Sequence, residues 1–343
     1  MIAGNSIPDF TGVLRQSDEL AAAGSWDDAI DLLTASNRFE ENPDIEKRLL
    51  ELRYQAFAGI ANSAPVPDWP KSLPDYFPDE TSIPEIPASE LCADVVTSAI
   101  AHHGSLMVRG MLDRNVASGI RDAIDHSFNS AATVPTLRTP VPPWYQPFSL
   151  HSEHHKFGAE RSYARRGGGV LAIDAPRALF RHLEALSAVG FDRLLQEYFG
   201  ERVALSAKKT TLRRTEPGSL GGWHQDGSFL GTDIRSLNIW TALSPCGVEA
   251  PSLDIVPRRL DYLVEMGGPD IFDWAVSNET AQSYGADYSI VRPVFETGDA
   301  LLFDQMTLHR TGVDDSMTKT RYAIEMWCFA ASTYPQEQIP LCW

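Results

Sequence analysis

The sequence predicts a mainly β protein with flanking helices, an α+β chain in which a separate helical segment precedes a β-barrel. Three observations indicate this class. Apolar residues recur at three- and four-residue spacing through residues 12–60, as on one face of a helix. Prolines crowd the stretch that follows. Beyond residue 200, short apolar runs alternate with turn residues, a pattern typical of barrels flanked by helices.

Residues 1–60 are predicted to form the N-terminal helical segment. Gly24 separates a first helix from a second, and Asn42 followed by Pro43 is typical of the cap and first turn of a third. The stretch around Trp26 resembles part of a tetratricopeptide repeat. It covers about one and a half repeats, fewer than the roughly three that such arrays need. We therefore expect a helical cap packed on the rest of the chain rather than a peptide-binding array.

Residues 61–87 are predicted to form a proline-rich connector. Proline has no backbone N–H and disrupts helix interiors, so we expect this segment to run extended over a surface. Its aromatic residues, Trp69, Tyr76 and Phe77, indicate that it is held against that surface.

Residues 88–343 are predicted to form the barrel domain. This part begins with a helix, a strand at 105–111 and a second helix that Asp113 opens. Further helices are expected at 175–187 and 189–199. The strands that follow are expected at 202–214, 236–244, 252–256, 289–295, 299–304, 306–311 and 321–330.

Residues 129–169 form the least regular part of this domain. A long loop of this kind in a compact domain is typical of a lid, a binding loop or a disordered segment. We expect a lid over a substrate, with a merely flexible loop as the alternative. Three histidines here raise the question of a second metal site, but no carboxylate pattern completes a ligand shell: His151, His154 and His155.

The charge balance excludes several kinds of partner. The 343 residues carry 29 basic and 46 acidic side chains, a net charge of −17. Such a chain repels nucleic acid and acidic membrane surfaces. No apolar stretch reaches the roughly 18 residues needed to span a bilayer, and the first residues lack the features of a signal peptide. We expect no nucleic acid and no membrane among the partners, and a small-molecule substrate.

The cysteines bear on the cellular compartment. Four cysteines are scattered without a C-x-x-C pair, so neither a disulfide framework nor a structural zinc site is indicated. This usage fits a reducing, cytoplasmic environment. The sequence leaves the oligomeric state open.

One short motif carries the clearest chemistry. In an extended segment side chains alternate faces, so His224 and Asp226 project to one side while Gln225 points away. A third ligand has to come from another strand, and His309 follows the apolar run 300–303. Two imidazoles and one carboxylate hold non-haem Fe(II) on one triangular face and leave positions open. The same groups would also bind zinc or manganese.

Arg321 is the second candidate functional residue. It opens the apolar run 321–330, which predicts a mostly buried strand, so its charge would be costly unless it is paired. A guanidinium offers two parallel donors to a carboxylate and keeps its charge at any working pH. The alternative is an exposed arginine at the start of a strand.

The pattern from Trp223 to Ala330 resembles the phytanoyl-CoA dioxygenase family of Fe(II)/2-oxoglutarate oxygenases. Three features carry the resemblance: W-H-Q-D-G at 223–227, S-L-N-I-W-T-A-L at 236–243, and G-D-A-L-L-F at 298–303 with His309 and Arg321 following. The family fold is a double-stranded β-helix, a jelly-roll barrel with the metal in its mouth. The resemblance implies that fold here, preceded by the N-terminal helical segment.

The resemblance also implies roles for individual residues. His224, Asp226 and His309 would be the catalytic iron ligands. Three more residues would bind the co-substrate: Arg321 its distal carboxylate, Thr311 through a hydroxyl, and Trp240 as a wall of the pocket. Plain core packing is the alternative for Trp240, and strand packing for Thr311. Related halogenases lack the carboxylate, so the presence of Asp226 favours hydroxylation.

The implied activity is that of an Fe(II)- and 2-oxoglutarate-dependent dioxygenase that hydroxylates a small molecule with O2 and releases succinate and CO2. Three alternatives stay open. The same site catalyses desaturation, cyclisation or epimerisation in some oxygenases. A metal-dependent jelly-roll enzyme of another class, such as a cupin isomerase or a zinc hydrolase, would ignore 2-oxoglutarate. The third alternative is a non-enzymatic adaptor built around the N-terminal helices.

Substrate identity does not follow from the sequence. The segment 250–259 departs from the family pattern, so we expect substrate recognition to differ there. Several arginines would favour an anionic substrate if they surround the mouth, although surface arginines are common: Arg165, Arg166, Arg258, Arg259 and Arg310.

Overall fold

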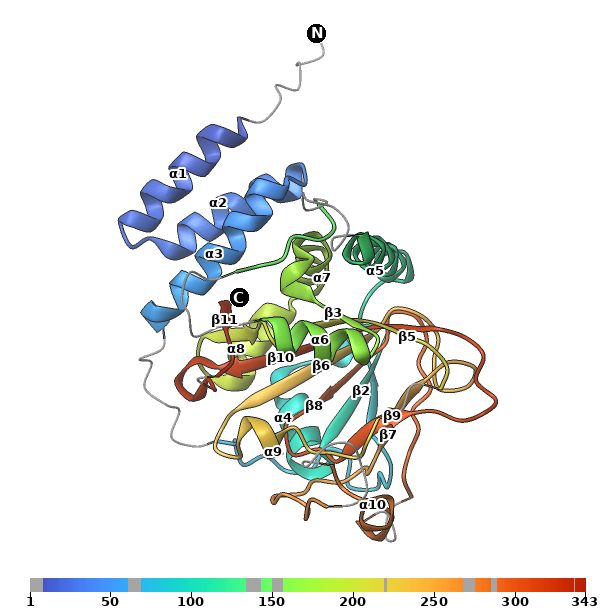
Figure 1. Ribbon diagram of the computed structural model, residues 1–343. Helices are drawn as coiled ribbons and strands as arrows, with labels where there is room; N and C mark the ends of the chain where they lie inside the picture. Colours follow the sequence, from blue (N-terminus) through green and yellow to red (C-terminus); the bar gives the residue numbers. More distant parts are fainter. Residues whose placement is uncertain are drawn as a thin grey trace.

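The chain combines helices and sheets, with one large, mostly antiparallel sheet (Figure 1). The computed structural model describes residues 9–60, 69–133, 143–149, 157–218, 221–267, 275–284, 289–335 and 337–343. Within these ranges more residues lie in helices than in strands. The expectation that strands would predominate is therefore wrong. The combination of a sheet with flanking helices is confirmed.

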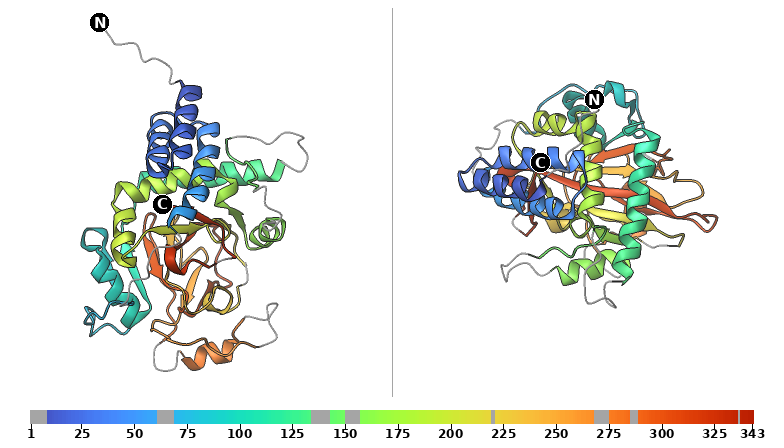
Figure 2. Two further views of the ribbon diagram at one scale, coloured as in Figure 1. Left: turned by 90° about the vertical axis from the view of Figure 1, so that its left-hand side faces the viewer. Right: turned by 90° about the horizontal axis from the view of Figure 1, so that it is seen from above.

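The N-terminal segment contains the three predicted helices, α1 (Phe10–Ala22), α2 (Trp26–Phe39) and α3 (Pro43–Ile60). Asn42 caps α3 as expected, because its side-chain oxygen accepts from the backbone N–H groups of Asp44 and Ile45. The helices stand at one end of the molecule (Figure 2).

Polar contacts join these helices to the rest of the chain. Arg53 on α3 is buried and donates to the carbonyl of Cys342 at 2.7 Å. Glu46 is also buried and accepts from Arg177 at 2.9 Å. Asp27 on α2 pairs with Arg202 at 2.7 Å. These three contacts between the N-terminal helices and the rest of the chain support a docked helical cap. We keep the division at residues 60 and 87 as a proposal.

The large sheet has the order β1-β2-β8-β6-β10-β4-β11, with β5 also pairing with β10 and β3 with β5. All pairs are antiparallel except β1 with β2. The strands are β1 (Glu85–Pro87), β2 (Ser105–Arg109), β3 (Gly169–Leu171), β4 (Val203–Ser206), β5 (Thr211–Thr215), β6 (Ser236–Ala242), β8 (Ala300–Phe303), β10 (Arg321–Ala330) and β11 (Pro340–Cys342).

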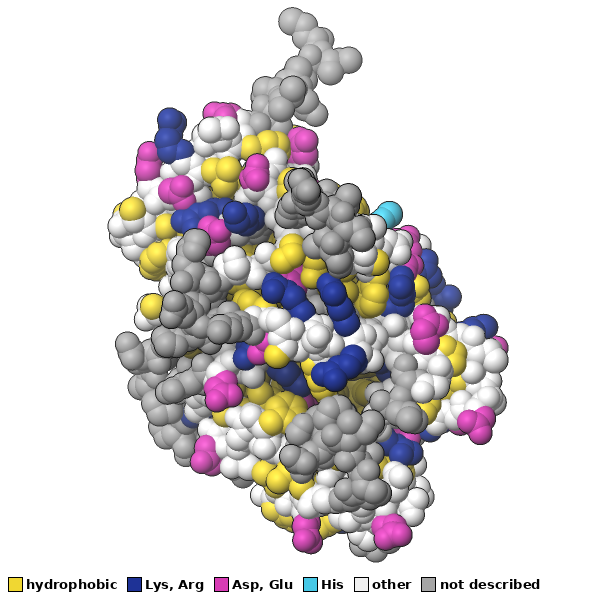
Figure 3. Space-filling view, viewed as in Figure 1, with side chains coloured by type: hydrophobic (Ala, Val, Ile, Leu, Met, Phe, Trp, Pro, Cys, Tyr) yellow, Lys and Arg dark blue, Asp and Glu magenta, His cyan; other side chains and the backbone are white. Residues whose placement is uncertain are grey.

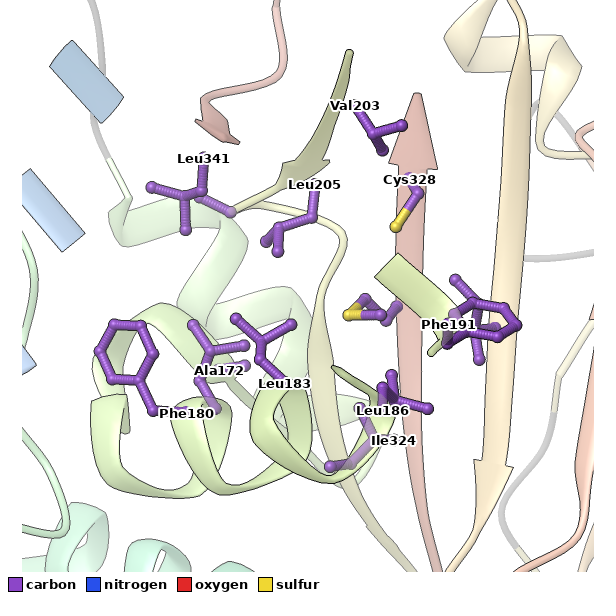
Figure 4. Close-up of a cluster of buried hydrophobic side chains, with 14 of the residues drawn as sticks. Ala172, Phe180, Leu183, Leu186, Phe191, Val203, Leu205, Ile324, Cys328 and Leu341 are labelled. Carbon is purple, nitrogen blue, oxygen red and sulfur yellow. The ribbon is translucent and has the colours of Figure 1, made fainter. Parts of the chain in front are cut away.

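Helices cover one face of this sheet. Alternation along β10 turns Ile324 and Cys328 toward a cluster of side chains from α7 (Pro176–Ala188) and α8 (Phe191–Phe199) (Figure 4). We call the opposite face the inner face. The expected helices at 175–187 and 189–199 are thus confirmed, as are those near 88 and after Asp113, which are α4 (Ala93–His103) and α5 (Arg114–Thr133).

The inner face carries a second hydrophobic cluster. It includes Trp240, Phe303 and Trp327 of the large sheet with Leu253 and Ile255 of a two-stranded sheet. That small sheet consists of β7 (Ser252–Ile255) and β9 (His309–Gly312). The two sheets therefore pack face to face, and we call the space between them the interior. The described strands do not close them into a continuous barrel.

Several expected boundaries need correction. The expected strand 289–295 is absent from the described residues there, which make only isolated bridges through Val291 and Phe295. The strand expected at 306–311 begins at His309, because the residues before it form a turn. The strands expected near 202–214 are β4 and β5, which a turn separates.

The irregular segment 129–169 contains a helix that the sequence analysis missed, α6 (Gly158–Arg166). Two other short helices were also missed, α9 (Gly227–Leu230) and α10 (Asn278–Tyr284). His151, His154 and His155, for which a second metal site was considered and not favoured, lie outside the described residues. No helix in the described ranges combines the length and the apolar character that crossing a membrane requires.

The buried carboxyl of Glu46 predicts a pH-dependent stability. Burial raises the pKa of Glu46 from 4.5 to about 7, although Arg177 opposes the shift. The folded protein then holds this proton more tightly than the unfolded chain, so stability falls as the pH rises between these values. We predict that Glu46→Gln matches wild type at about pH 4 and is more stable by up to about 3 kcal/mol at about pH 8.

Urea unfolding at both pH values tests this prediction, and Glu41→Gln is the matched control. Arg181 lowers the pKa of Glu41, against the effect of burial, so that variant should lose stability at the higher pH. A Glu46→Gln effect that is the same at both pH values would contradict the prediction.

Candidate active site

A backbone bridge brings the two histidines of the predicted site together. The N–H of His224 donates to the carbonyl of His309 at 2.9 Å, and the reverse bond is 3.0 Å long. Residues opposed in this way in an antiparallel pair carry their side chains on the same face. The two imidazole rings accordingly lie side by side, with centroids 4.4 Å apart.

Asp226 reaches the same place by a turn rather than by strand alternation. Its backbone is helical, with φ −62° and ψ −22°, and it forms the N-terminal boundary of α9. The expectation that 224–226 is one extended segment is therefore wrong, although the two side chains do converge. Gly227 permits the turn to approach the residues before His309, because a Cβ there would lie 3.2 Å from the carbonyl oxygen of Gln305.

The three predicted ligand groups form one cluster. One ligand atom from each of His224, Asp226 and His309 lies within 4.8 Å of the other two. Nε2 of His309 is 3.8 Å from Oδ2 of Asp226. Asp226 and His309 are buried and His224 is half-buried. The cluster can therefore hold a metal ion that is shielded from most of the solvent.

Hydrogen bonds orient both imidazoles. Nδ1 of His224 lies 2.9 Å from the carbonyl oxygen of Gly222, and Nδ1 of His309 lies 3.0 Å from that of Thr307. A carbonyl can only accept, so each Nδ1 carries the proton and each Nε2 has the lone pair that a metal requires. Burial and the neighbouring His309 also lower the pKa of His224 to about 4, which keeps it neutral at pH 7.

Gln225, between the two ligands, is a positioning residue that the sequence analysis did not identify. Its side-chain nitrogen donates to the carbonyls of Met306 and Tyr262 at 2.7 and 3.0 Å. Its oxygen accepts from the N–H of Val264 at 2.7 Å. The amide thus ties the first two ligands to the turn that leads into His309.

A charged group beside Asp226 was also missed. Lys209, in the turn between β4 and β5, donates to Oδ1 of Asp226 at 3.0 Å. Burial lowers the pKa of Lys209, but Asp226 and Glu325 raise it by more, so it stays protonated. Glu325 on β10 pairs with Arg213 at 2.6 Å, and burial is outweighed by Arg213 and Lys209, which lower the pKa of Glu325 to about 2. No sequence motif marked these residues, because they converge only through the pairing of β5 with β10.

Arg321 is buried at the start of β10, as expected, but no carboxylate of the described residues pairs with it. It donates to the carbonyl of Ser252 at 3.0 Å and to the hydroxyl of Thr215 at 2.8 Å, while its Nε has no hydrogen-bond partner within the described ranges. Burial lowers the pKa of Arg321 to about 10, so it remains charged at neutral pH. The guanidinium lies over the ring of Trp240, 5.3 Å from its centroid.

Thr311 lies on β9 two residues after His309, so strand alternation directs both side chains to the same face. Its hydroxyl passes close to Gly221, where a Cβ would lie 3.0 Å from it. Trp240 packs against Phe295 with ring centroids 4.7 Å apart. Two of the three predicted co-substrate residues, Arg321 and Trp240, are thus in direct contact.

The residues present fit the metal and the co-substrate that the resemblance implies. Oδ2 of Asp226 is buried and receives no hydrogen bond from the part of the chain that the structure describes, which is costly unless a cation takes that place. The two imidazoles and this oxygen are the donor set that Fe(II) accepts. Arg321 offers a buried positive charge that pairs with no carboxylate in the described ranges, as the binding of a dicarboxylate requires.

The arginines expected near the mouth do not form one group. Arg259 is paired with Asp304 and Arg310 with Asp254, so both charges are neutralised locally. Arg165 and Arg166 are exposed in the last turn of α6. Lys and Arg side chains gather on the face over α6 and its neighbouring strands (Figure 3).

Comparisons with known proteins give one family and several solved structures. The model of the phytanoyl-CoA dioxygenase (PhyH) family matches residues 102–321, well over half of the chain. No curated protein sequence matches. Among solved structures, EctD from S. alaskensis with 2-oxoglutarate and 5-hydroxyectoine is 16% identical, with 69% of this chain and 75% of that chain covered and a TM-score of 0.48.

A second solved structure is the non-heme alpha ketoglutarate dependent carbocyclase SnoK from nogalamycin biosynthesis. It is 14% identical, with 71% of this chain and 86% of that chain covered and a TM-score of 0.48. The family match carries the assignment. Members of the family use Fe(II), 2-oxoglutarate and O2, and the chain is an oxygenase of this kind. The chain belongs to the phytanoyl-CoA dioxygenase family.

Proposed function

We propose that the chain is a dioxygenase that hydroxylates a small-molecule substrate with consumption of 2-oxoglutarate and O2 and release of succinate and CO2. The convergence of His224, Asp226 and His309 within 4.8 Å is the observation that carries the proposal. The retained carboxylate favours hydroxylation over halogenation. The net charge of −17 agrees with a small molecule, because it disfavours nucleic acid.

Three residues are proposed as iron ligands, His224 and His309 through Nε2 and Asp226 through Oδ2. Arg321 would pair with the distal carboxylate of 2-oxoglutarate, with Trp240 as the wall beneath it and Thr311 adding a hydroxyl. When bound, iron and 2-oxoglutarate together supply the oxidising power that activates O2 toward a substrate C–H bond. The protein residues bind and orient the metal, the co-substrate and the substrate, and they exclude water from the site.

Unpartnered polar groups in the interior support this assignment. Asn238 of β6 is fully buried and its amide has no hydrogen-bond partner among the described residues. It is opposed by Trp327 and Phe303 in the sheet register and lies two residues before Trp240, on the same face. Folded proteins leave few such groups unsatisfied, so an interior that contains several is suited to polar ligands.

We further propose a double-stranded β-helix for residues 88–343, with 1–60 as a helical cap, and a lid in the region 129–169. The packing of the small sheet on the inner face supports the first proposal. Lys208 pairs with Glu160 of α6 at 2.9 Å, next to Lys209, which supports the lid by linking that region to the site.

Succinate release tests the proposed function against its alternatives. Purified protein with Fe(II), 2-oxoglutarate and a panel of small molecules should form succinate under air and none without O2. Mass spectrometry of the products then separates hydroxylation, a gain of one oxygen, from desaturation, cyclisation or epimerisation. Product formation with zinc and without 2-oxoglutarate would instead favour a metal-dependent jelly-roll enzyme of another class.

We predict that His224→Ala and Asp226→Ala each abolish iron-dependent turnover of 2-oxoglutarate, because each removes one of three ligands. Succinate formation and bound iron per chain are the measurements. Asp18→Ala is the control, since this exposed carboxylate on α1 lies outside the site. Full activity in both ligand variants would defeat the assignment.

We predict that Arg321→Lys raises the KM for 2-oxoglutarate roughly 10- to 100-fold with a smaller change in kcat. The lysine keeps the charge but loses the paired donors, and hydrogen bonds to charged groups contribute about 1.5–3 kcal/mol. Thr311→Val should raise this KM by only about 3- to 10-fold. Steady-state kinetics at fixed Fe(II) measures both, and an unchanged KM in Arg321→Lys would contradict the co-substrate role.

A further inference from the structure

The two carboxylate oxygens of Asp226 have different surroundings. Oδ1 accepts a hydrogen bond of 3.0 Å from Nζ of Lys209. Oδ2 has no hydrogen-bond donor among the described residues and lies 3.8 Å from Nε2 of His309. One oxygen is thus occupied by a protein cation, and the other is turned toward the imidazoles.

Packing holds Lys209 in this position from several sides. Its ammonium lies 4.6 Å from the ring centroid of Phe229, which follows Asp226 on α9. It is also 4.0 Å from Oε1 of Glu325. Its side chain is only 22% exposed, so solvent screens this charge incompletely. The ion pair between Lys209 and Asp226 is therefore mostly buried and differs from a solvent-exposed surface pair.

The charge of Lys209 acts mainly on Asp226. Glu325 is the other acid nearby, but it is already paired with Arg213 through hydrogen bonds of 2.6 and 3.2 Å. The pair Glu325 and Arg213 is neutral as a unit. Beside the predicted ligands, the ammonium of Lys209 therefore pairs with the carboxylate of Asp226.

We propose that Lys209 is a positioning residue of the iron centre that presents Oδ2 of Asp226 alone to the metal and keeps the bound iron ferrous. This inference rests on the proposed function. A hydrogen bond from an ammonium withdraws electron density from the carboxylate and so weakens it as a donor. A fixed positive charge also repels Fe(III) more than Fe(II), since the ion gains one unit of charge when it loses an electron.

The test is a redox titration of the iron-loaded full-length protein. Ferricyanide accepts one electron from each Fe(II), giving Fe(III) and ferrocyanide, and the high-spin ferric EPR signal reports the fraction oxidised at each poised potential. Lys209→Met removes charge and hydrogen bond, Lys209→Gln keeps a neutral donor, and Lys209→Arg keeps the charge. Lys208→Met is the matched control, because this lysine of the same turn pairs with Glu160.

We expect Lys209→Met and Lys209→Gln to increase the ratio of Fe(III) to Fe(II) at a given potential by at least about tenfold. Lys209→Arg and Lys208→Met should follow wild type. Under anaerobic conditions, the visible charge-transfer band of the Fe(II) and 2-oxoglutarate complex should move to longer wavelength in Lys209→Met, because the iron becomes more electron-rich.

Equal ferric fractions in wild type, Lys209→Gln and Lys209→Arg would overturn the inference while leaving the proposed function intact. If Lys209→Met does not fold, as judged by circular dichroism, the Gln and Arg variants make the same comparison. Failure of wild type to bind one iron per chain would overturn the proposed function and this inference with it.

Discussion

The site depends on one backbone constraint, the two reciprocal hydrogen bonds between His224 and His309. They fix the register between the segment that carries the first two ligands and strand β9, which carries the third. A slip of one residue would turn one imidazole to the opposite face, because side chains alternate along extended backbone. The pairing of β9 with β7 and the amide of Gln225 hold this register from both sides.

The interior then contains charges that the fold tolerates only in particular arrangements. Glu325 and Arg213 neutralise each other, and Lys209 neutralises one oxygen of Asp226. Among the described residues, Arg321 has no paired carboxylate, and Oδ2 of Asp226 has no hydrogen-bond donor. Burying a polar or charged group without a partner raises the free energy of the folded protein. A bound cation would pair with Oδ2 of Asp226, and a bound dicarboxylate would pair with Arg321.

The sequence predicted the parts that local patterns determine. The N-terminal helices, the bounds of β10 and the cap at Asn42 follow from periodicity and capping chemistry, and the family follows from the motifs after Trp223. Other features depend on distant partners. The turn at Asp226, the isolated bridges in place of a strand at the described residues 289–295 and the position of Lys209 are set by tertiary contacts, which leave no periodic trace in the chain.

Anomalous diffraction at the iron edge, from crystals grown anaerobically with Fe(II), would locate the metal relative to the three proposed ligands. We expect one strong peak within bonding distance of Nε2 of His224, Nε2 of His309 and Oδ2 of Asp226, with Oδ1 still hydrogen-bonded to Lys209. A peak at another place, or no peak between these three side chains at full iron loading, would contradict the proposed iron site.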